Sequence, residues 1–141
     1  MSKEQELAEQ VVGGMMAKDE FSRWLGIEVV RVAPNASTTR MKVRPEMVNG
    51  FGVAHGGIAY SLADSALAFA SNTHGKVTVA IDNSIAYPAA VNVGDVLTAV
   101  AELESSTKKL AFLRVTVTNQ SGVTVAVFRG TVYKTEKAHL Q

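Results

Sequence analysis

The chain has 141 residues, of which 47% are hydrophobic and 19% are charged, and its formal net charge is +1. This length suits one domain with a sizeable core, and the composition excludes a disordered or fibrous chain. The charge balance indicates neither a nucleic-acid partner nor a membrane surface. The chain has no cysteine, so disulfides, thiolate metal ligands and a cysteine nucleophile are excluded. Its three histidines do not have the spacing of a metal cluster.

We expect a single domain over residues 1–141, with residues 1–24 as a helical lead-in. Residues 3–19 have helical composition, with Gly13-Gly14 as a weak point or break. Acidic residues are scattered through this segment and it has no long apolar stretch, so it does not resemble a signal peptide. No window is typical of a membrane span, and we expect a cytoplasmic protein.

Two strands are predicted next. Residues 25–33 (LGIEVVRVA) are rich in β-branched side chains and end at the turn signal Pro34-Asn35. Residues 37–45 (STTRMKVRP) alternate between apolar or hydroxyl side chains and basic ones, which indicates a strand with one solvated face.

One long helix and a run of strands complete the pattern. The helix is predicted from about 56 to 73, with His74-Gly75 as its C-terminal cap. Strands separated by turn signals are then expected near 76–87, 96–105, 108–119 and 122–134. Antiparallel hairpins with one long helix packed on them indicate the α+β class.

Asp64 stands out because it is the only residue between His55 and His74 that is charged at neutral pH, inside an otherwise mostly apolar helix. On a helical wheel it lies at the centre of a narrow polar stripe, roughly 140° wide. The other members of this stripe are small or uncharged: Gly57, Tyr60, Ser61, Ser65, Ala68, Ser71 and Asn72.

Two interpretations of the polar stripe are open. It could simply face water, but such faces usually collect Lys, Glu and Gln. Small side chains instead allow another backbone or a ligand to approach closely. A carboxylate held in such a place loses hydration, which raises its pKa and makes Asp64 a candidate general base or nucleophile.

The start of the predicted helix offers a complementary group. The amides of Gly56 and Gly57 are among the unpaired donors of a helix N-terminus and favour an oxyanion. Gly56 and Asp64 lie about 11–12 Å apart along a helix, too far to act on one carbonyl group. Two antiparallel helices related by a two-fold axis would bring Gly56 of one chain near Asp64 of the other.

The motif NGFGVAHGG, followed by SLADSALAFASN, resembles the hotdog-fold acyl-CoA thioesterases of the phenylacetate-pathway (PaaI-type) family. The resemblance extends to FSRWLGIEVV, TRMKVRPEMVNG and YPAAVNVGDVLTAVAEL, and so covers nearly the whole chain. It implies an antiparallel sheet wrapped around a central helix. It also implies a homodimer with a continuous sheet, often paired again into a homotetramer, and active sites at the dimer interface.

The resemblance also implies roles for individual residues. Asp64 would activate water or attack the thioester directly, while the Gly56 amide of the partner chain would polarise the thioester carbonyl. Asn49 would orient the water or the carbonyl, and His55 would shape the loop and contact the carbonyl region. Related enzymes carry a supporting hydroxyl on the strand after the helix. The candidates here are Thr78, counted back from Pro88, and Ser65 beside Asp64, with Gly57 as a further substrate contact.

By this resemblance the substrate is phenylacetyl-CoA or a related aryl or medium-chain acyl-CoA, and neither a metal nor a cofactor is expected. The CoA phosphates need cations, for which the sequence offers Arg40, Lys76, Lys108, Lys109 and Arg129. The alternatives are a hydratase or dehydratase of the same fold and a non-catalytic CoA-ester-binding module. The hydratases carry a histidine five residues after an Asp, or one paired with a Glu on the helix. Here position 69 is Phe69 and the helix has no Glu.

Overall fold

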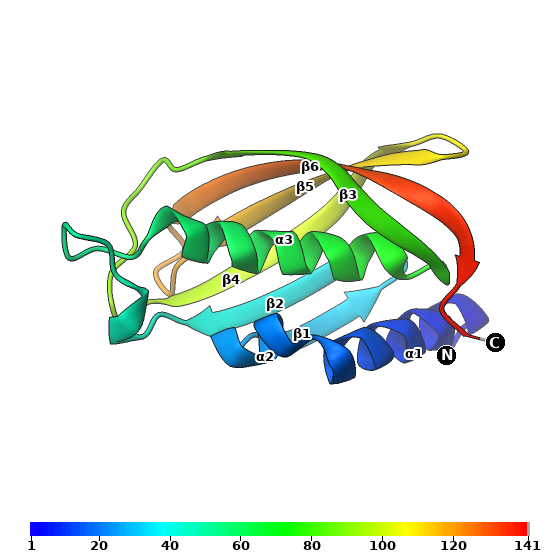
Figure 1. The fold of residues 1–141 in the computed structure, drawn as a ribbon, viewed down its shortest axis with the longest axis horizontal. Helices are drawn as coiled ribbons and strands as arrows, with labels where there is room; N and C mark the ends of the chain where they lie inside the picture. The colour runs from blue at the N-terminus through cyan, green and yellow to red at the C-terminus, as the bar shows by residue number, and fades with distance from the viewer. Residues whose placement is uncertain (141) are drawn as a thin grey trace.

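The computed structural model describes residues 1–140 and contains one antiparallel sheet wrapped around a long helix (Figure 1). Three helices, α1, α2 and α3, and a 3-10 turn, η1, span Lys3–Lys18, Glu20–Leu25, Gly56–Asn72 and Pro45–Met47. The strands β1 to β6 span Glu28–Ala33, Ala36–Lys42, Lys76–Ala86, Val96–Ser106, Leu110–Thr118 and Thr124–Ala138. This is the α+β arrangement that the resemblance implied.

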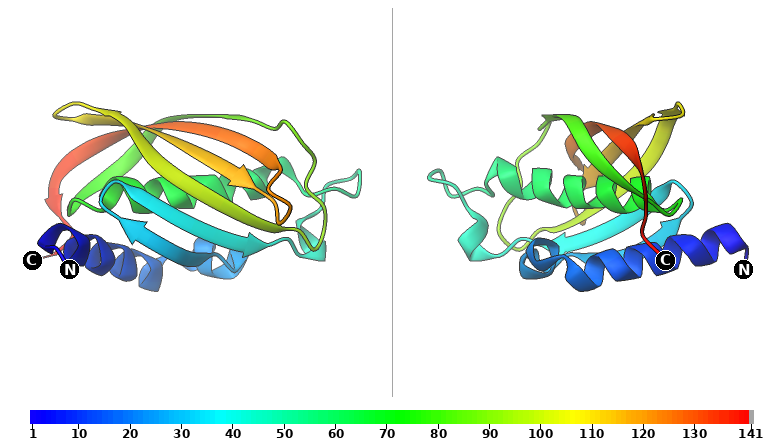
Figure 2. Two further views of the ribbon diagram at one scale, coloured as in Figure 1. Left: turned by 180° about the vertical axis from the view of Figure 1, so that it is seen from behind. Right: turned by 45° about the vertical axis from the view of Figure 1, so that its right-hand side comes forward.

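The six strands follow the order β1-β2-β4-β5-β6-β3, and all neighbouring strands are antiparallel. The strand β3 therefore lies at one edge of the sheet. One side of β3 pairs with β6, and no strand among residues 1–140 pairs with the other side. Figure 2 shows the sheet curling over one side of α3, while α1 and α2 run beside β1.

The core forms where α3 meets the concave face of the sheet. Alanine and leucine side chains let the helix lie close to the strands, and its fully buried face includes Leu62, Ala63, Ala66 and Leu67. Burial of each large side chain contributes about 1.5–3 kcal/mol. The predicted helix over 56–73 is confirmed to within one residue, and Asp64, in the polar stripe, is only partly buried.

Three features differ from the predictions. First, α1 continues through Gly13-Gly14 without a break, because Ala8, Val11 and Val12 are buried and tertiary packing outweighs the low helix propensity of glycine.

Second, residues 20–25 form α2 instead of the beginning of a strand. Asp19 caps α2 by accepting a hydrogen bond from the Ser22 amide, and Gly26 ends it in the left-handed region at φ 78°. The strand β1 consequently begins only at Glu28.

Third, β6 extends to Ala138 rather than ending near residue 134, because its final residues pair with the start of β3. Among residues 1–140, no helix is both long enough and apolar enough to cross a membrane.

Candidate active site

Asp64 lies near the middle of α3, half-buried between β3 and α2. The side-chain amide of Asn83, on β3, donates hydrogen bonds to Asp64 Oδ1 at 3.2 Å and to the Tyr60 hydroxyl oxygen at 3.0 Å. Burial raises the pKa of the Asp64 carboxyl above its usual 3.8, the Asn83 hydrogen bond lowers it in part, and the negative charge of Asp19 raises it. Asp64 is thus a carboxylate with weakened hydration and one positioned donor.

Asn83 reaches Asp64 because β6 carries a glycine at the crossing point. A Cβ atom at position 130 would lie 2.5 Å from Leu67 Cδ2 and 2.8 Å from Asn83 Oδ1. Gly130 therefore allows α3 and the Asn83 side chain to lie directly against β6. Asn83 Oδ1 is buried and has no hydrogen-bond partner among residues 1–140.

The other side of the polar stripe is covered by α2. Ser65 is buried and its hydroxyl hydrogen-bonds with Ser22 Oγ at 2.7 Å, while Ser22 Oγ donates to Asp19 Oδ2 at 2.6 Å. Ser65 thus fastens α3 to α2, and its hydroxyl is directed toward α2. The simple solvent-facing interpretation of the stripe is wrong, because β3 and α2 flank it.

The start of α3 presents the backbone of Gly56. The side chain of His55 caps the helix by accepting a hydrogen bond from the Gly57 amide to Nδ1 at 2.9 Å. The Tyr87 hydroxyl donates to the Gly56 carbonyl oxygen at 2.8 Å. Gly56 is the first residue of the helix, so helical geometry leaves its N–H without a partner, whereas the Gly57 N–H is used by the cap.

Asn49 stabilises a turn through its hydrogen bonds. Its Oδ1 accepts a hydrogen bond from the Phe51 amide at 2.8 Å, and its backbone N–H donates to the Val53 carbonyl at 2.8 Å. These bonds close the loop that precedes His55. Asn49 therefore shapes the approach to the start of α3.

Thr78 lies beyond the opposite end of α3. Its backbone N–H donates to Asn72 Oδ1 at 2.8 Å, and its hydroxyl lies 3.1 Å from His74 Nε2. The structure thus brings Asp64 together with Asn83 and not with Thr78. Asn83 was missed by sequence reasoning.

A single subunit also leaves Asp64 apart from Gly56. Eight residues of α-helix separate them, which corresponds to about 12 Å along the axis. Within one chain, the Asp64 carboxyl and the Gly56 N–H are therefore too far apart to act on the same carbonyl group.

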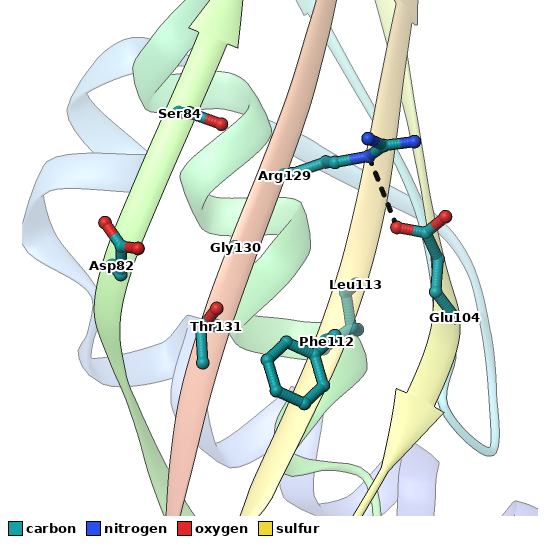
Figure 3. A pocket seen from close by; sticks show the side chains of 8 residues that line it. All are labelled: Asp82, Ser84, Glu104, Phe112, Leu113, Arg129, Gly130 and Thr131. Carbon is teal, nitrogen blue, oxygen red and sulfur yellow. Dashed lines mark ion pairs between the residues drawn. The ribbon is translucent and has the colours of Figure 1, made fainter.

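Two cavities bear on the location of the site, and Asp64 lines neither of them. One, of about 390 Å³, opens on the outer face of the sheet, with α3 behind the strands (Figure 3). Asp82, Ser84 and Thr131 line it together with Arg129 and Glu104, whose charged groups are 3.4 Å apart. A smaller cavity of about 130 Å³ lies at the start of α3, beside Gly56.

Comparison with known proteins shows the family to which the chain belongs. The family model of the thioesterase superfamily matches residues 51–126, which contain the whole of α3. A putative esterase of Archaeoglobus fulgidus is 35% identical over 133 residues, covering 94% of this chain and 86% of its own. The acyl-coenzyme A thioesterase PaaI of Escherichia coli is 34% identical over 116 residues, covering 82% and 83%.

The solved structure of the E. coli PaaI protein superimposes with a TM-score of 0.93 at 31% identity and covers 95% of this chain and 97% of that one. The fold is therefore the hotdog fold of the thioester hydrolases. The chain belongs to the thioesterase superfamily and, within it, to the PaaI-type acyl-CoA thioesterases.

Replacement of Asn83 by alanine is expected to shift the pH dependence of catalysis. The Asn83 hydrogen bond favours the ionised carboxylate, so its loss raises the pKa of Asp64 further. The acidic limb of the kcat/KM profile should then move to higher pH, measured by thiol release between pH 4 and pH 9. Asn92→Ala, at an exposed position in the β3–β4 connection, is the control. An unshifted limb in Asn83→Ala would contradict this role.

Proposed function

We propose that the protein hydrolyses phenylacetyl-CoA or related aryl or medium-chain acyl-CoA thioesters to the free acid and CoA. The observation that carries the proposal is that α3 holds two complementary groups. The half-buried Asp64 carboxyl, whose pKa is raised, lies at its middle, and the Gly56 N–H, which helical geometry leaves unpaired, lies at its start. A base and an oxyanion donor are the two groups that acyl transfer to water requires.

In the proposed reaction the ionised Asp64 either removes a proton from the attacking water or itself attacks the thioester carbon to form an anhydride, which water then hydrolyses. Both routes place negative charge on the carbonyl oxygen and release CoA as the leaving thiol. The Gly56 N–H stabilises this oxyanion, an interaction worth about 10²–10³ in rate. Because a thioester is already an activated acyl group, the proposed chemistry needs no metal and no cofactor.

The site is proposed to form between two subunits. The β3 edge offers the surface, because it is 11 residues long and its outer side pairs with no strand among residues 1–140. Its Val79 and Ile81 are 47% and 58% exposed, which is unusual for a free edge. Pairing of two β3 edges across a two-fold axis would set the two α3 helices antiparallel, with Gly56 of one subunit facing Asp64 of the other.

The remaining roles follow from position. Asn49 and His55 hold the loop and cap that present the Gly56 amide. For the CoA phosphates we propose Lys76, Lys108 and Lys109, since Arg40 and Arg129 already form ion pairs with Glu28 and Glu104. A homodimer is sufficient for the proposed site, and a homotetramer would contain two such dimers.

The proposal is tested by thiol release from a panel of aryl and aliphatic CoA esters. We expect turnover of phenylacetyl-CoA that the Asp64→Asn replacement lowers by about 10²–10⁴. Binding of CoA esters without turnover would instead indicate a non-catalytic module. Hydration of an enoyl-CoA without thiol release would indicate the hydratase alternative.

An acidic side chain on the β3 edge is expected to separate the subunits. Ile81→Asp would add one negative charge to each of the two paired edges in place of an exposed apolar side chain, and these like charges would repel one another across the interface. Sedimentation should show a monomer, and circular dichroism should show that this monomer is folded. Thioester hydrolysis should decrease in proportion to the loss of dimer. A variant that sediments as a monomer and keeps full activity would refute the shared site.

A further inference from the structure

The cavity beside Gly56 has an apolar lining. It occupies about 130 Å³ at the N-terminal end of α3, closed by the segment that connects β3 with β4. Gly56 and Ala59 contribute from α3, and Tyr87, Ala89 and Val91 contribute from the connecting segment. Val91 and Ala59 belong to the buried core, so this end of the cavity is a fixed, apolar surface.

Two polar atoms of this cavity, His55 Nδ1 and the Tyr87 hydroxyl, are already engaged within the protein. His55 Nδ1 accepts the Gly57 amide, and the Tyr87 hydroxyl donates to the Gly56 carbonyl. Burial raises the pKa of the Tyr87 phenol, so the hydroxyl keeps the proton that it donates. Most of the lining is alanine and valine, so an occupant with several amide groups, such as the pantetheine arm of CoA, would leave most of those groups without partners, which is costly. The cavity therefore favours an apolar occupant.

The position of the cavity identifies this occupant. If the thioester oxygen accepts the Gly56 N–H, the first carbon of the acyl group is attached to the same carbonyl carbon and lies next to the cavity. The volume also limits the acyl group, because an apolar protein cavity of about 150 Å³ accommodates one benzene molecule. A cavity of about 130 Å³ thus suits a single ring or a short chain.

Tyr87 is the largest of the exposed side chains that line this cavity. Its side chain is 48% exposed, and a Cβ atom at position 56 would lie 3.2 Å from both Cζ and the hydroxyl oxygen of Tyr87. The half-exposed ring therefore lies directly against Gly56 and borders the cavity. In contrast to Ala59 and Val91, it can be removed or moved without opening the core.

We propose that Tyr87 closes an acyl-binding pocket at the start of α3 and restricts the enzyme to acyl groups about the size of one aromatic ring. This inference rests on the proposed role of Gly56. It assigns the specificity for the acyl group to a residue outside the helix that carries Asp64.

The test compares Tyr87→Ala and Tyr87→Phe on phenylacetyl-CoA and decanoyl-CoA. Tyr87→Ala should lower kcat/KM for phenylacetyl-CoA about tenfold and raise the ratio of decanoyl to phenylacetyl turnover by a similar factor. Tyr87→Phe keeps the ring and should keep the wild-type ratio. Tyr133→Ala removes another exposed tyrosine, on β6, and serves as the matched control. An unchanged ratio in Tyr87→Ala would overturn the assignment.

A binding measurement separates this inference from the proposed function. Calorimetry would compare CoA with a phenylethyl thioether of CoA, which cannot be hydrolysed. Wild-type protein should bind the thioether more tightly than CoA, and Tyr87→Ala should lose this difference. Retention of the difference in Tyr87→Ala overturns the role of Tyr87 even if turnover depends on Asp64. Failure of the wild-type protein to hydrolyse any CoA ester would contradict the proposed function alone.

Discussion

Asp64→Asn is expected to lower the rate of thioester hydrolysis by about 10²–10⁴, because the amide can neither accept a proton from water nor attack the carbonyl carbon. The replacement is nearly isosteric, and its Oδ1 can still accept the hydrogen bond from Asn83. The variant should therefore remain folded and dimeric. Steady-state kinetics on phenylacetyl-CoA, together with sedimentation, measures both properties. Hydrolysis at the normal rate would show that another group is the base.

The same variant should be more stable than the wild type at neutral pH. Burial raises the pKa of Asp64, so ionisation of this carboxyl disfavours the folded state. Below the unfolded-state pKa of 3.8 the carboxyl is neutral in both states, and the difference in stability between the wild type and Asp64→Asn should be smallest there. The stability advantage of Asp64→Asn should grow as the pH rises through the folded-state pKa. Melting temperatures measured from pH 3 to pH 8 test this dependence.

Gly56→Pro is expected to lower kcat by about 10²–10³, the value of one oxyanion-hole donor. Proline replaces the N–H at this position with its ring Cδ, and no helical hydrogen bond is lost, because the first residue of a helix makes no internal hydrogen bond through its amide. The preceding residue is also compatible, since His55 has φ −62° and ψ 138°, the conformation preferred before proline. The helix should therefore form normally in the variant.

Gly56→Ala is the matched control for this deletion. Alanine and proline both add a Cβ atom 3.2 Å from the Tyr87 ring, and the half-exposed ring has room to yield by a few tenths of an ångström. Alanine keeps the N–H and proline replaces it with the ring Cδ, so the difference in kcat between the two variants measures the loss of the donor together with the bulk of the ring. Equal kcat values in Gly56→Ala and Gly56→Pro would exclude the amide from the reaction.

The sequence predicted α3 and its polar stripe because both depend on local periodicity. The spacing in the sequence also indicated that Asp64 and Gly56 of one chain lie too far apart to act on the same carbonyl group. The predictions that failed depended on tertiary contacts. Gly13-Gly14 does not break α1, because the neighbouring Val11 and Val12 are buried.

The partner of Asp64 could not be found by counting residues. The register of β3 against β6 shifts between Ala80 and Asp82, so an ungapped count back from Pro88 does not identify the residue that faces α3. Asn83 reaches Asp64 because Gly130, 47 positions later in the chain, leaves room for its side chain. A glycine inside an otherwise bulky strand is the one signal in the sequence that marks a close approach at this point.

Complementation between two inactive variants tests the shared site most directly. Asp64→Asn and Gly56→Pro subunits, co-expressed with different affinity tags and purified in tandem, would give dimers that contain both. If the site uses Asp64 of one subunit and Gly56 of the other, each mixed dimer has one intact site and should recover about half of the wild-type activity. Mixed dimers no more active than the two parent variants would place both groups in the same subunit and contradict the account.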